Sequence, residues 1–153
     1  MSSMTRSVTV HRPLSASSAV LARPDEVMAV IADLGRTARV EDAGDGAEQW
    51  EVFILLGTMY VGGRVRIGQA GDGVLAWRSE SGFHHHARFE AVADGDFSAI
   101  RLHFDFRIDG VFTGWLAARL VHGYIGRFAD AVLESLRHRI EYGDAGRRPR
   151  VRR

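Results

Sequence analysis

The chain has 153 residues, a formal net charge of +1 at pH 7 and no cysteine. Its length suits a single domain, and a content of 46% hydrophobic and 25% charged residues is typical of a globular protein with one core. The lack of cysteine excludes disulfides and thiolate metal sites, and the small net charge predicts no nucleic-acid partner for the body of the protein.

The N-terminal segment contains no apolar run of signal-peptide length, and no part of the chain approaches the roughly 20 apolar residues of a membrane span. We therefore expect a cytoplasmic protein. Residues 1–6 are expected to be a flexible end. Residues 8–22 carry several β-branched side chains and are interrupted by Pro13, so they predict an edge strand with a bulge or two short strands.

A helix is predicted to begin at Pro24, because proline suits the first turn of a helix and the acids Asp25 and Glu26 favour the positive end of its dipole. Gly35 follows the last apolar residue of this pattern and ends the helix. Residues 36–41 are a candidate for a short second helix.

From Glu48 the hydrophobic period changes to two, which predicts antiparallel strands. The first strand, residues 48–56, is apolar on both faces after Trp50. A hairpin follows, with strands at residues 60–69 and 74–80 around a Gly-Asp-Gly turn. Its expected inward-facing residues are Val61, Val65, Ile67, Leu75 and Trp77.

The next hairpin joins residues 83–93 to residues 98–109 and has the most regular alternation. The dipeptide Asp94-Gly95 fits a two-residue type I′ turn. A slip of one residue would turn polar side chains inward, so the hydrophobic pattern constrains the register. The expected inner pairs are Phe89 with Ile100, Ala87 with Leu102 and His85 with Phe104.

Residues 113–142 have the period of a long amphipathic helix. Thr113 is the expected N-cap, and Gly143 is the expected left-handed residue at the C-terminus. Charged residues such as Glu141 are expected on the polar face. The expected apolar stripe comprises Ala117, Leu120, Val121, Tyr124, Phe128, Ala131, Val132 and Ser135.

Strands and helices are segregated along the chain, which predicts an α+β domain over residues 7–143. A helix of this kind needs a partner surface, since an isolated helix has little stability of its own. We expect a curved antiparallel sheet of about six or seven strands wrapped around the long C-terminal helix, with one or two short helices after the first strand. Residues 144–153 contain five arginines and are expected to be a disordered basic tail.

Two stretches of the chain resemble the START/SRPBCC helix-grip superfamily. One is Ala22-Arg23-Pro24-Asp25-Glu26-Val27 followed by Ala32-Asp33-Leu34, which is similar to the family's strand-to-helix segment. The other runs from Ile108-Asp109-Gly110 into Thr113-Gly114-Trp115-Leu116 and Arg119-Leu120, at the entry to the last helix. The resemblance covers nearly the whole chain.

Within this superfamily, the second stretch and Tyr60-Val61-Gly62-Gly63 look most like the branch of the carbon monoxide dehydrogenase G subunit. The polyketide cyclase/dehydrase and lipid-transport branch is the other candidate. One departure from the family pattern is the absence of the usual tryptophan after the first helix, where this chain has Thr37-Ala38-Arg39-Val40.

The resemblance implies a hydrophobic cavity between the sheet and the long helix, but it implies no particular reaction. Aromatic stripes often pack a dry core, and that alternative stays open. Inward-facing aromatic residues and a few polar side chains are the expected ligand-binding set. It comprises Trp50, Trp77, Ser79, His85, Phe89, Phe104, Val121, Tyr124 and Phe128.

His85 and Tyr124 are the candidates for catalysis. An inward-facing histidine loses hydration free energy unless it has a partner, which makes His85 unusual on an apolar face. If His85 met Tyr124 in a cavity, the two could orient or protonate an enolisable carbonyl, as a cyclase or aromatase requires. A histidine alone does not make a catalyst, so whether the protein is an enzyme stays open.

The three consecutive histidines suggest a metal site as one interpretation. In the expected register, His86 lies opposite His103 and His84 lies opposite Asp105 on the outer face. These side chains are of the right types for zinc or nickel. However, neighbouring strand positions hold them about 5 Å apart on a flat, solvated surface. We therefore favour a polar surface without metal, and we expect no cofactor.

The function expected from these observations is the binding of a hydrophobic small molecule of the lipid, polyketide or isoprenoid type. One alternative is a cyclase or aromatase, and another is an accessory protein similar to the carbon monoxide dehydrogenase G subunit. The basic tail could make weak contact with anionic lipids, at about 1 kcal/mol per charge near a membrane surface. Both a monomer and a homodimer are compatible with the sequence.

Overall fold

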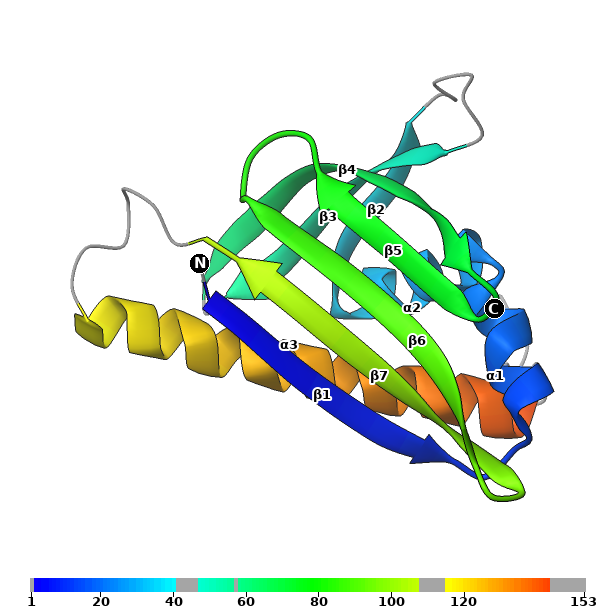
Figure 1. The fold of residues 1–153 in the computed structure, drawn as a ribbon. Coiled ribbons are helices and arrows are strands. Elements are labelled where there is room, and N and C mark those ends of the chain that lie inside the picture. The colour runs from blue at the N-terminus through cyan, green and yellow to red at the C-terminus, as the bar shows by residue number, and fades with distance from the viewer. Residues whose placement is uncertain (1, 41–46, 57, 108–114, 144–153) are drawn as a thin grey trace, which may run out of the picture.

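The computed structural model describes residues 2–40, 47–56, 58–107 and 115–143, without the side chains of residues 56 and 115–118. The α+β architecture predicted from the sequence is confirmed (Figure 1). In chain order the elements are β1 (Ser2–Val10), α1 (Leu14–Leu21), α2 (Pro24–Leu34), β2 (Gly35–Val40), β3 (Glu48–Leu56), β4 (Met59–Gly71), β5 (Val74–Ser79), β6 (His85–Asp94), β7 (Phe97–Phe106) and α3 (Trp115–Tyr142).

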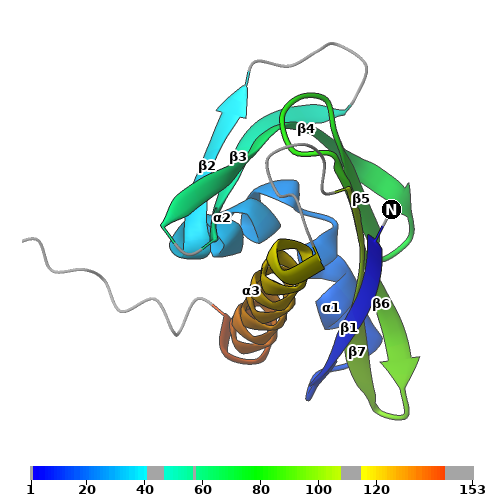
Figure 2. The ribbon, with the colours of Figure 1, turned by 90° about the vertical axis from the view of Figure 1, so that its left-hand side faces the viewer.

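The seven strands form one antiparallel sheet in the order β1-β7-β6-β5-β4-β3-β2. The sheet is strongly curved, and α3 lies along its concave side (Figure 2). The two short helices share this side: α2 packs against β2 and α3, and α1 packs against β6 and β7. The long C-terminal helix is therefore wrapped by the sheet, as expected.

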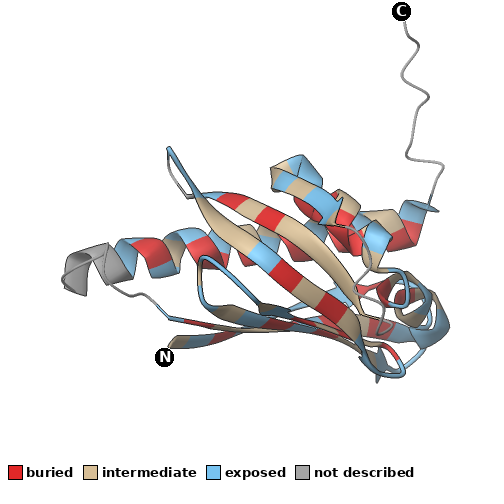
Figure 3. Ribbon diagram, turned by 90° about the horizontal axis from the view of Figure 1, so that it is seen from above, coloured by how far each residue is buried: buried red, intermediate tan, exposed pale blue. Residues whose placement is uncertain are grey.

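Buried positions alternate along the strands, so one face of the sheet forms the core (Figure 3). On β5, Leu75 and Trp77 are buried and their neighbours are not. On β7, Ser98, Ile100, Leu102 and Phe106 are buried in the same alternating way. This alternation follows from the pleat of a strand, which turns successive side chains to opposite faces.

The buried stripe of α3 is displaced around the helix from the expected one. Leu120 and Tyr124 were expected on it, but they are 57% and 38% exposed. Each lies one residue before a buried position, a rotation of about 100° around the helix axis. The stripe that packs against the core comprises Val121, Ile125, Ala129, Val132, Leu133, Leu136 and Ile140.

The N-terminal part of the chain differs most from expectation. Residues 2–6, expected to be flexible, are part of β1, which pairs with β7 from Ser2↔Phe106 to Val10↔Ser98. Residues 14–21 form the helix α1, although an extended segment was expected. Ser17 and Leu21 are its fully buried residues, one turn apart, so its packing follows a helical spacing. Most of the β-branched residues that suggested an extended segment, Val8, Thr9 and Val10, belong to β1.

A further difference concerns residues 36–41, the candidate for a second helix. Gly35–Val40 is the strand β2, and it pairs antiparallel with β3 from Gly35↔Ile54 to Val40↔Gln49. Tertiary pairing with β3 therefore decides its conformation, which local propensity does not reveal.

The β6–β7 hairpin is shifted by two residues from the expected register. Its turn is formed by Gly95 and Asp96, and Gly95 has a φ of +59°. Glycine at the first of two turn positions is the pattern of a type II′ turn, whereas the expected type I′ turn was centred on Asp94 and Gly95. A shift of two residues keeps every side chain on its face, so the inward set is unchanged. The observed pairs are Phe89↔Leu102, Ala87↔Phe104 and His85↔Phe106.

Some expectations lie outside the described residues. These are the N-cap at Thr113, the end of the strand at residues 108–109, the side chain of Ala117 and the basic tail at residues 144–153. Gly143 is described, and its φ of +54° confirms the left-handed end of α3. Of the helices that the structure describes, none combines the length and the apolar surface of a membrane span.

A buried carboxylate joins the last turn of α3 to the segment between β1 and α1. The side chain of Glu141, expected on the polar face, is only 4% exposed. Its Oε1 accepts a hydrogen bond from the backbone N–H of His11 at 2.9 Å, and Arg137 pairs with its Oε2. Arg12 donates a hydrogen bond to the backbone carbonyl of Glu141. These partners allow the charge to be buried, because an unpaired buried carboxylate is strongly unfavourable.

The first prediction tests the position of the buried stripe. We expect Leu136→Ala to lower the free energy of unfolding by about 2–5 kcal/mol, because Leu136 is fully buried and its truncation leaves a cavity. The matched control is Leu120→Ala on the exposed side of the same helix, which we expect to change it by less than about 0.5 kcal/mol. Chemical denaturation measures both, and an equal loss from the two variants would contradict the observed rotation of α3.

The second prediction concerns Glu141 and pH. The hydrogen bond from the His11 backbone, together with the charge of Arg137, holds the pKa of Glu141 below its ordinary value. A lowered carboxyl pKa stabilises the folded state above about pH 4.5, and this contribution is lost as the pH falls below that value. We expect Glu141→Gln to lower the free energy of unfolding by roughly 1–3 kcal/mol at pH 7 and by less in acid.

Glu134→Gln is the matched control, because Glu134 also pairs with Arg137 but its side chain is 61% exposed. We expect a change of less than about 1 kcal/mol at any pH, as for other exposed ion pairs. Urea denaturation at several pH values compares the two variants. A difference between Glu141→Gln and the original protein that stays constant down to pH 3 would rule out a role for the Glu141 charge.

Candidate functional site

Two small cavities lie between the concave face of the sheet and α3. The first has a volume of about 20 Å³ and the second about 30 Å³. They share four lining residues: Ile31 of α2, Trp77 of β5, Phe104 of β7 and Phe128 of α3. The first is completed by Phe89, Leu102, Ile125, Ala129 and Val132, and the second by Val52, Ile54, Val61, Gly62, Phe83 and His85.

The lining is almost entirely apolar. Among the described residues, no charged side chain lines either cavity, and His85 and Trp77 are the lining residues with polar side-chain atoms. A charged group placed here would lose its hydration without gaining a partner. The chemistry of the site therefore depends on apolar contact and on the hydrogen-bonding groups of these two residues.

His85 is held in place by hydrogen bonds and ring contacts. Its Nδ1 lies 2.8 Å from the carbonyl oxygen of Phe83, which can only accept, so Nδ1 carries the proton. Its backbone N–H donates to Ser79 Oγ at 3.1 Å. The imidazole stacks on Phe83 and Phe104, with ring centroids 5.4 and 5.5 Å away. Nε2 is therefore left as the acceptor of the ring.

Burial lowers the pKa of His85 below its ordinary value of 6.5, and the neighbouring His86 and His84 act in the same direction. The hydrogen bond to Phe83 opposes these effects but does not cancel them. His85 is therefore neutral at pH 7, with Nε2 available as a hydrogen-bond acceptor or a base.

The connection between β5 and β6 positions His85, and two glycines allow it to pack against β4. Gly82 has a φ of +73°, and a Cβ added to it would lie 2.1 Å from the carbonyl oxygen of Gly62. Phe83 donates its backbone N–H to that same oxygen at 3.1 Å. The close approach fixes Phe83, whose own carbonyl holds the imidazole.

Trp77 carries an unsatisfied donor. The residue is 5% exposed, and its indole Nε1 is buried without a hydrogen-bond partner among the described residues. Its ring packs on Phe89, with centroids 5.3 Å apart. Most buried polar groups in native proteins have a partner, so this N–H is an unusual feature of a residue that lines both cavities.

Five of the nine residues expected to bind a ligand line the cavities: Trp77, His85, Phe89, Phe104 and Phe128. Trp50 is directed to Glu48 instead, with Nε1 donating to Oε2 at 2.9 Å. Ser79 supports the backbone of His85, and Val121 is buried outside both cavity walls. The aliphatic part of the wall was not in the expected set, although the alternation in β3 and β7 places Val52, Ile54 and Leu102 inward.

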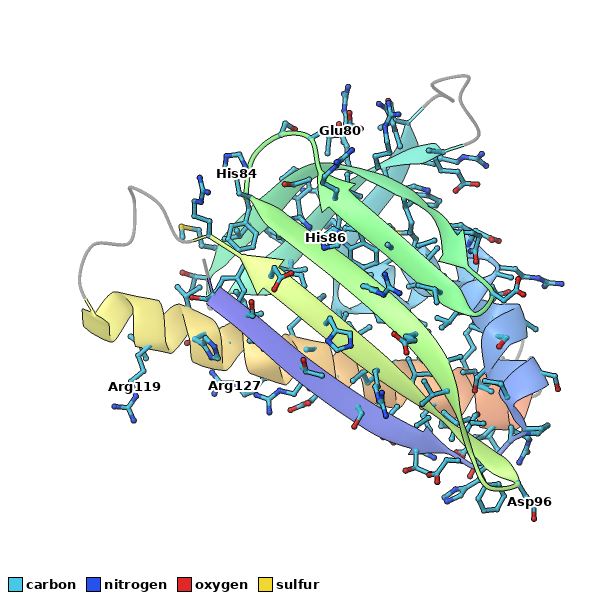
Figure 4. All side chains as sticks on the ribbon, in the orientation of Figure 1. Glu80, His84, His86, Asp96, Arg119 and Arg127 are labelled. Atoms are coloured by element: carbon cyan, nitrogen blue, oxygen red, sulfur yellow. The ribbon has the colours of Figure 1, made fainter. Side chains whose placement is uncertain are left out.

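The structure does not bring Tyr124 and His85 together in either cavity. The guanidinium of Arg127 lies over the Tyr124 ring, 4.7 Å from its centroid. Arg127 extends from the side of α3 that faces away from the sheet (Figure 4). The one-residue rotation of the buried stripe accounts for this difference, since it turns Tyr124 toward solvent.

The four residues considered as a metal site do not pair as expected. His86 lies opposite Asp105, with Nδ1 and Oδ2 3.9 Å apart, and His103 lies opposite Arg88 and contacts Thr5 Oγ1 at 3.0 Å. His84 precedes β6, away from His86 (Figure 4). Within the described part of the chain, no three potential ligands of the His, Asp and Glu types are grouped to hold a metal ion.

A wider groove of about 240 Å³ lies where α1, the start of α2 and the end of α3 meet. Arg139 and Glu26 form an ion pair in its wall, and Arg23 is also part of it. This groove shares no lining residue with the two apolar cavities. Arg139 and Glu26 already pair with each other there, so we place the candidate site in the apolar cavities.

No family model matches this sequence, and no curated protein matches it. Several solved structures share its fold. The protein TTHA0849 from Thermus thermophilus has a TM-score of 0.78 and 11% sequence identity, over 91% of this chain and 97% of its own. The Zhui aromatase/cyclase from a Streptomyces species has a TM-score of 0.74 and 19% identity, over 92% and 94% of the two chains.

A START superfamily protein from Mycobacterium smegmatis has a TM-score of 0.68 and 13% identity, over 91% of this chain and 97% of its own. In all three cases the similarity extends over nearly the full length of both chains, so it includes the curved sheet, the short helices and the long C-terminal helix. The chain therefore has the helix-grip fold of the START/SRPBCC superfamily.

Proposed function

We propose that this protein binds a hydrophobic small molecule between the concave face of the sheet and α3. The observation that carries the proposal is the pair of apolar cavities, which share the side chains of Ile31, Trp77, Phe104 and Phe128. Ligand pockets typically combine such an apolar lining with a few polar groups that fix orientation. Here those groups are the imidazole of His85 and the indole N–H of Trp77.

The cavities are much smaller than an occupied ligand pocket. Their volumes of about 20 and 30 Å³ hold water-sized molecules, whereas small-molecule sites usually enclose roughly 300–1,000 Å³. A larger ligand therefore requires the shared side chains to move apart. Phe104 and Phe128 are the best placed to do so, because both border the two cavities and both are only half-buried.

Native mass spectrometry of the purified protein, followed by extraction into organic solvent, tests the proposal directly. We expect a mass above that of the polypeptide and recovery of a neutral, apolar compound. Binding of N-phenyl-1-naphthylamine, an uncharged dye whose fluorescence rises in apolar surroundings, gives an independent measure. We expect saturable binding of one dye molecule per chain.

The third prediction uses cavity filling. Val132→Ile adds a methylene group to the first cavity and Val52→Ile adds one to the second. We expect the double variant to bind the dye at least about fivefold more weakly, because a methylene in an apolar pocket strongly affects what fits. We also expect its free energy of unfolding to stay equal or rise by up to about 1–2 kcal/mol. Weaker binding without loss of stability would indicate that the dye needs the filled cavity space, because a variant with a damaged fold would also be less stable.

Val8→Ile is the matched control. It makes the same chemical change at a half-buried position of β1 that lines neither cavity. We expect its affinity for the dye to equal that of the original protein. If the double variant also binds the dye with unchanged affinity, the dye occupies another surface and the proposal fails.

A second candidate function, acid–base catalysis of the cyclase type, is favoured by His85. Its neutral imidazole has Nε2 free while Nδ1 is fixed by Phe83, which is the state a general base needs. One similar structure is described as an aromatase/cyclase. Binding ranks first because the described residues of the two cavity walls include no second titratable group to act as the acid.

The fourth prediction follows from this candidate. If His85 is a base, the protein should speed the exchange of the α-protons of 1-tetralone with D2O, and His85→Phe should abolish the acceleration. Proton NMR measures the exchange rate. The control is His86→Phe, which removes a neighbouring imidazole whose partner is Asp105 on the outer face. If the acceleration persists in His85→Phe, a residue other than His85 is the base.

A further inference from the structure

Two side chains that line the apolar cavities carry hydrogen-bonding groups: a buried donor without a partner among the described residues, and an imidazole acceptor on a ring whose other nitrogen is already bonded. The donor is Trp77 Nε1, in a side chain that lines both cavities. The acceptor is His85 Nε2, in a side chain that lines the second cavity. The two groups differ in kind, so they select different features of a bound molecule.

The Trp77 N–H has lost its hydration without gaining a protein acceptor. Such a group is unfavourable in a folded protein, and a phenylalanine at this position would pack without the unpaired donor. An indole N–H only donates, so the partner that would satisfy it must offer a lone pair. A carbonyl or ether oxygen on a guest molecule provides one.

The imidazole of His85 has the complementary requirement. Its Nδ1–H is occupied by the Phe83 carbonyl at 2.8 Å, so Nε2 can only accept while the ring is neutral. A hydroxyl group on the guest would satisfy it. Phe83 and Phe104 stack on the ring and restrict its rotation, so Nε2 keeps a fixed direction.

The positions of the two residues separate these requirements in space. Trp77 pairs with Ala87 across β5 and β6, and His85 is two residues from Ala87 on the same face. Diagonal neighbours of this kind have backbones about 7–8 Å apart. A guest that satisfies both residues therefore carries its acceptor and its donor on different parts of an apolar framework.

The absence of charged residues from the described walls adds a further restriction. A carboxylate or phosphate would have to leave water without a cation to pair with. Fatty acids and phospholipid headgroups are poor occupants on this ground. A pure hydrocarbon is also a poor occupant, since it leaves the buried N–H of Trp77 unsatisfied.

We infer that Trp77 and His85 determine specificity for a neutral, oxygenated ring compound, whose carbonyl oxygen accepts from Trp77 Nε1 and whose hydroxyl donates to His85 Nε2. This inference rests on the proposed function, because it assumes that the apolar cavities open to hold a guest. It assigns the two residues separate roles that can be removed one at a time.

Four related compounds test the inference: tetralin, 1-tetralone, 5,6,7,8-tetrahydro-2-naphthol and 6-hydroxy-1-tetralone. They share one framework and carry neither group, the carbonyl, the hydroxyl, or both. Affinities are measured by displacement of N-phenyl-1-naphthylamine from the original protein and from Trp77→Phe and His85→Phe. We expect each group to improve binding to the original protein by roughly three- to tenfold, as one buried hydrogen bond allows.

The variants should lose these gains selectively. In Trp77→Phe, the carbonyl should give no advantage over tetralin while the hydroxyl still does, and in His85→Phe the reverse should hold. His85→Gln retains an acceptor in its amide oxygen and should recover part of the preference for the hydroxyl. Thermal unfolding of each variant establishes that it is folded before its affinities are compared.

The outcomes separate this inference from the proposed function. If tetralin binds as well as the oxygenated compounds, or if the carbonyl advantage persists in Trp77→Phe, the inference is overturned while ligand binding stands. If none of the compounds, including tetralin, displaces the dye or binds to the protein, the proposed function is overturned together with the inference.

Discussion

The structure depends on the burial of one side of α3 in the concave face of a curved sheet. A 28-residue helix with an apolar stripe is not stable alone, and the sheet supplies the surface that covers it. The sheet curves (Figure 2), while the helix axis stays nearly straight (Figure 1). Aromatic residues from β5, β7 and α3 lie between the two surfaces together with aliphatic residues. The two cavities lie among these aromatic residues, between the two surfaces.

Two cavity-lining residues, His85 and Trp77, carry hydrogen-bonding groups that an ordinary apolar core lacks. The Gly62–Gly82 approach fixes Phe83, the Phe83 carbonyl fixes the tautomer of His85, and burial keeps the imidazole neutral. Trp77 adds a donor that the described protein groups leave unpaired. A dry core has no need of such groups, and a solvated cleft would satisfy them with water. Their combination favours a site in which an apolar ligand replaces the contacts that the wall residues make with one another.

Much of the fold follows from hydrophobic period alone. The alternation in residues 98–106 and the helical pattern before Gly143 are strong because each repeats over several turns or residue pairs. The failures have particular causes. The β6–β7 register was predicted two residues away from the observed one, because a shift of two keeps every inward-facing residue on the same face. The strand β2 was a candidate for a helix, because local propensity does not reveal its pairing with β3. Tyr124 was misplaced because Leu120 and Tyr124 extend the apolar pattern of α3 beyond the part that the sheet covers. The aromatic wall could therefore be predicted, whereas hydrogen-bond partners such as Phe83 required coordinates.

The arrangement of β1 has a consequence for how the chain folds. β1 lies at the N-terminus, but its neighbour in the sheet is β7, so Ser2 pairs with Phe106. The bond between the His11 backbone and Glu141 joins positions 130 residues apart. Contacts of such high sequence separation form late, because the loop between them must close first. On the ribosome, β1 would wait unpaired until β7, which ends at Phe106, had emerged, while the β2–β6 meander could already assemble from local hairpins. The first strand of this sheet in chain order is thus among the last to be incorporated into it, and its exposed edge is the part most in need of protection during that delay.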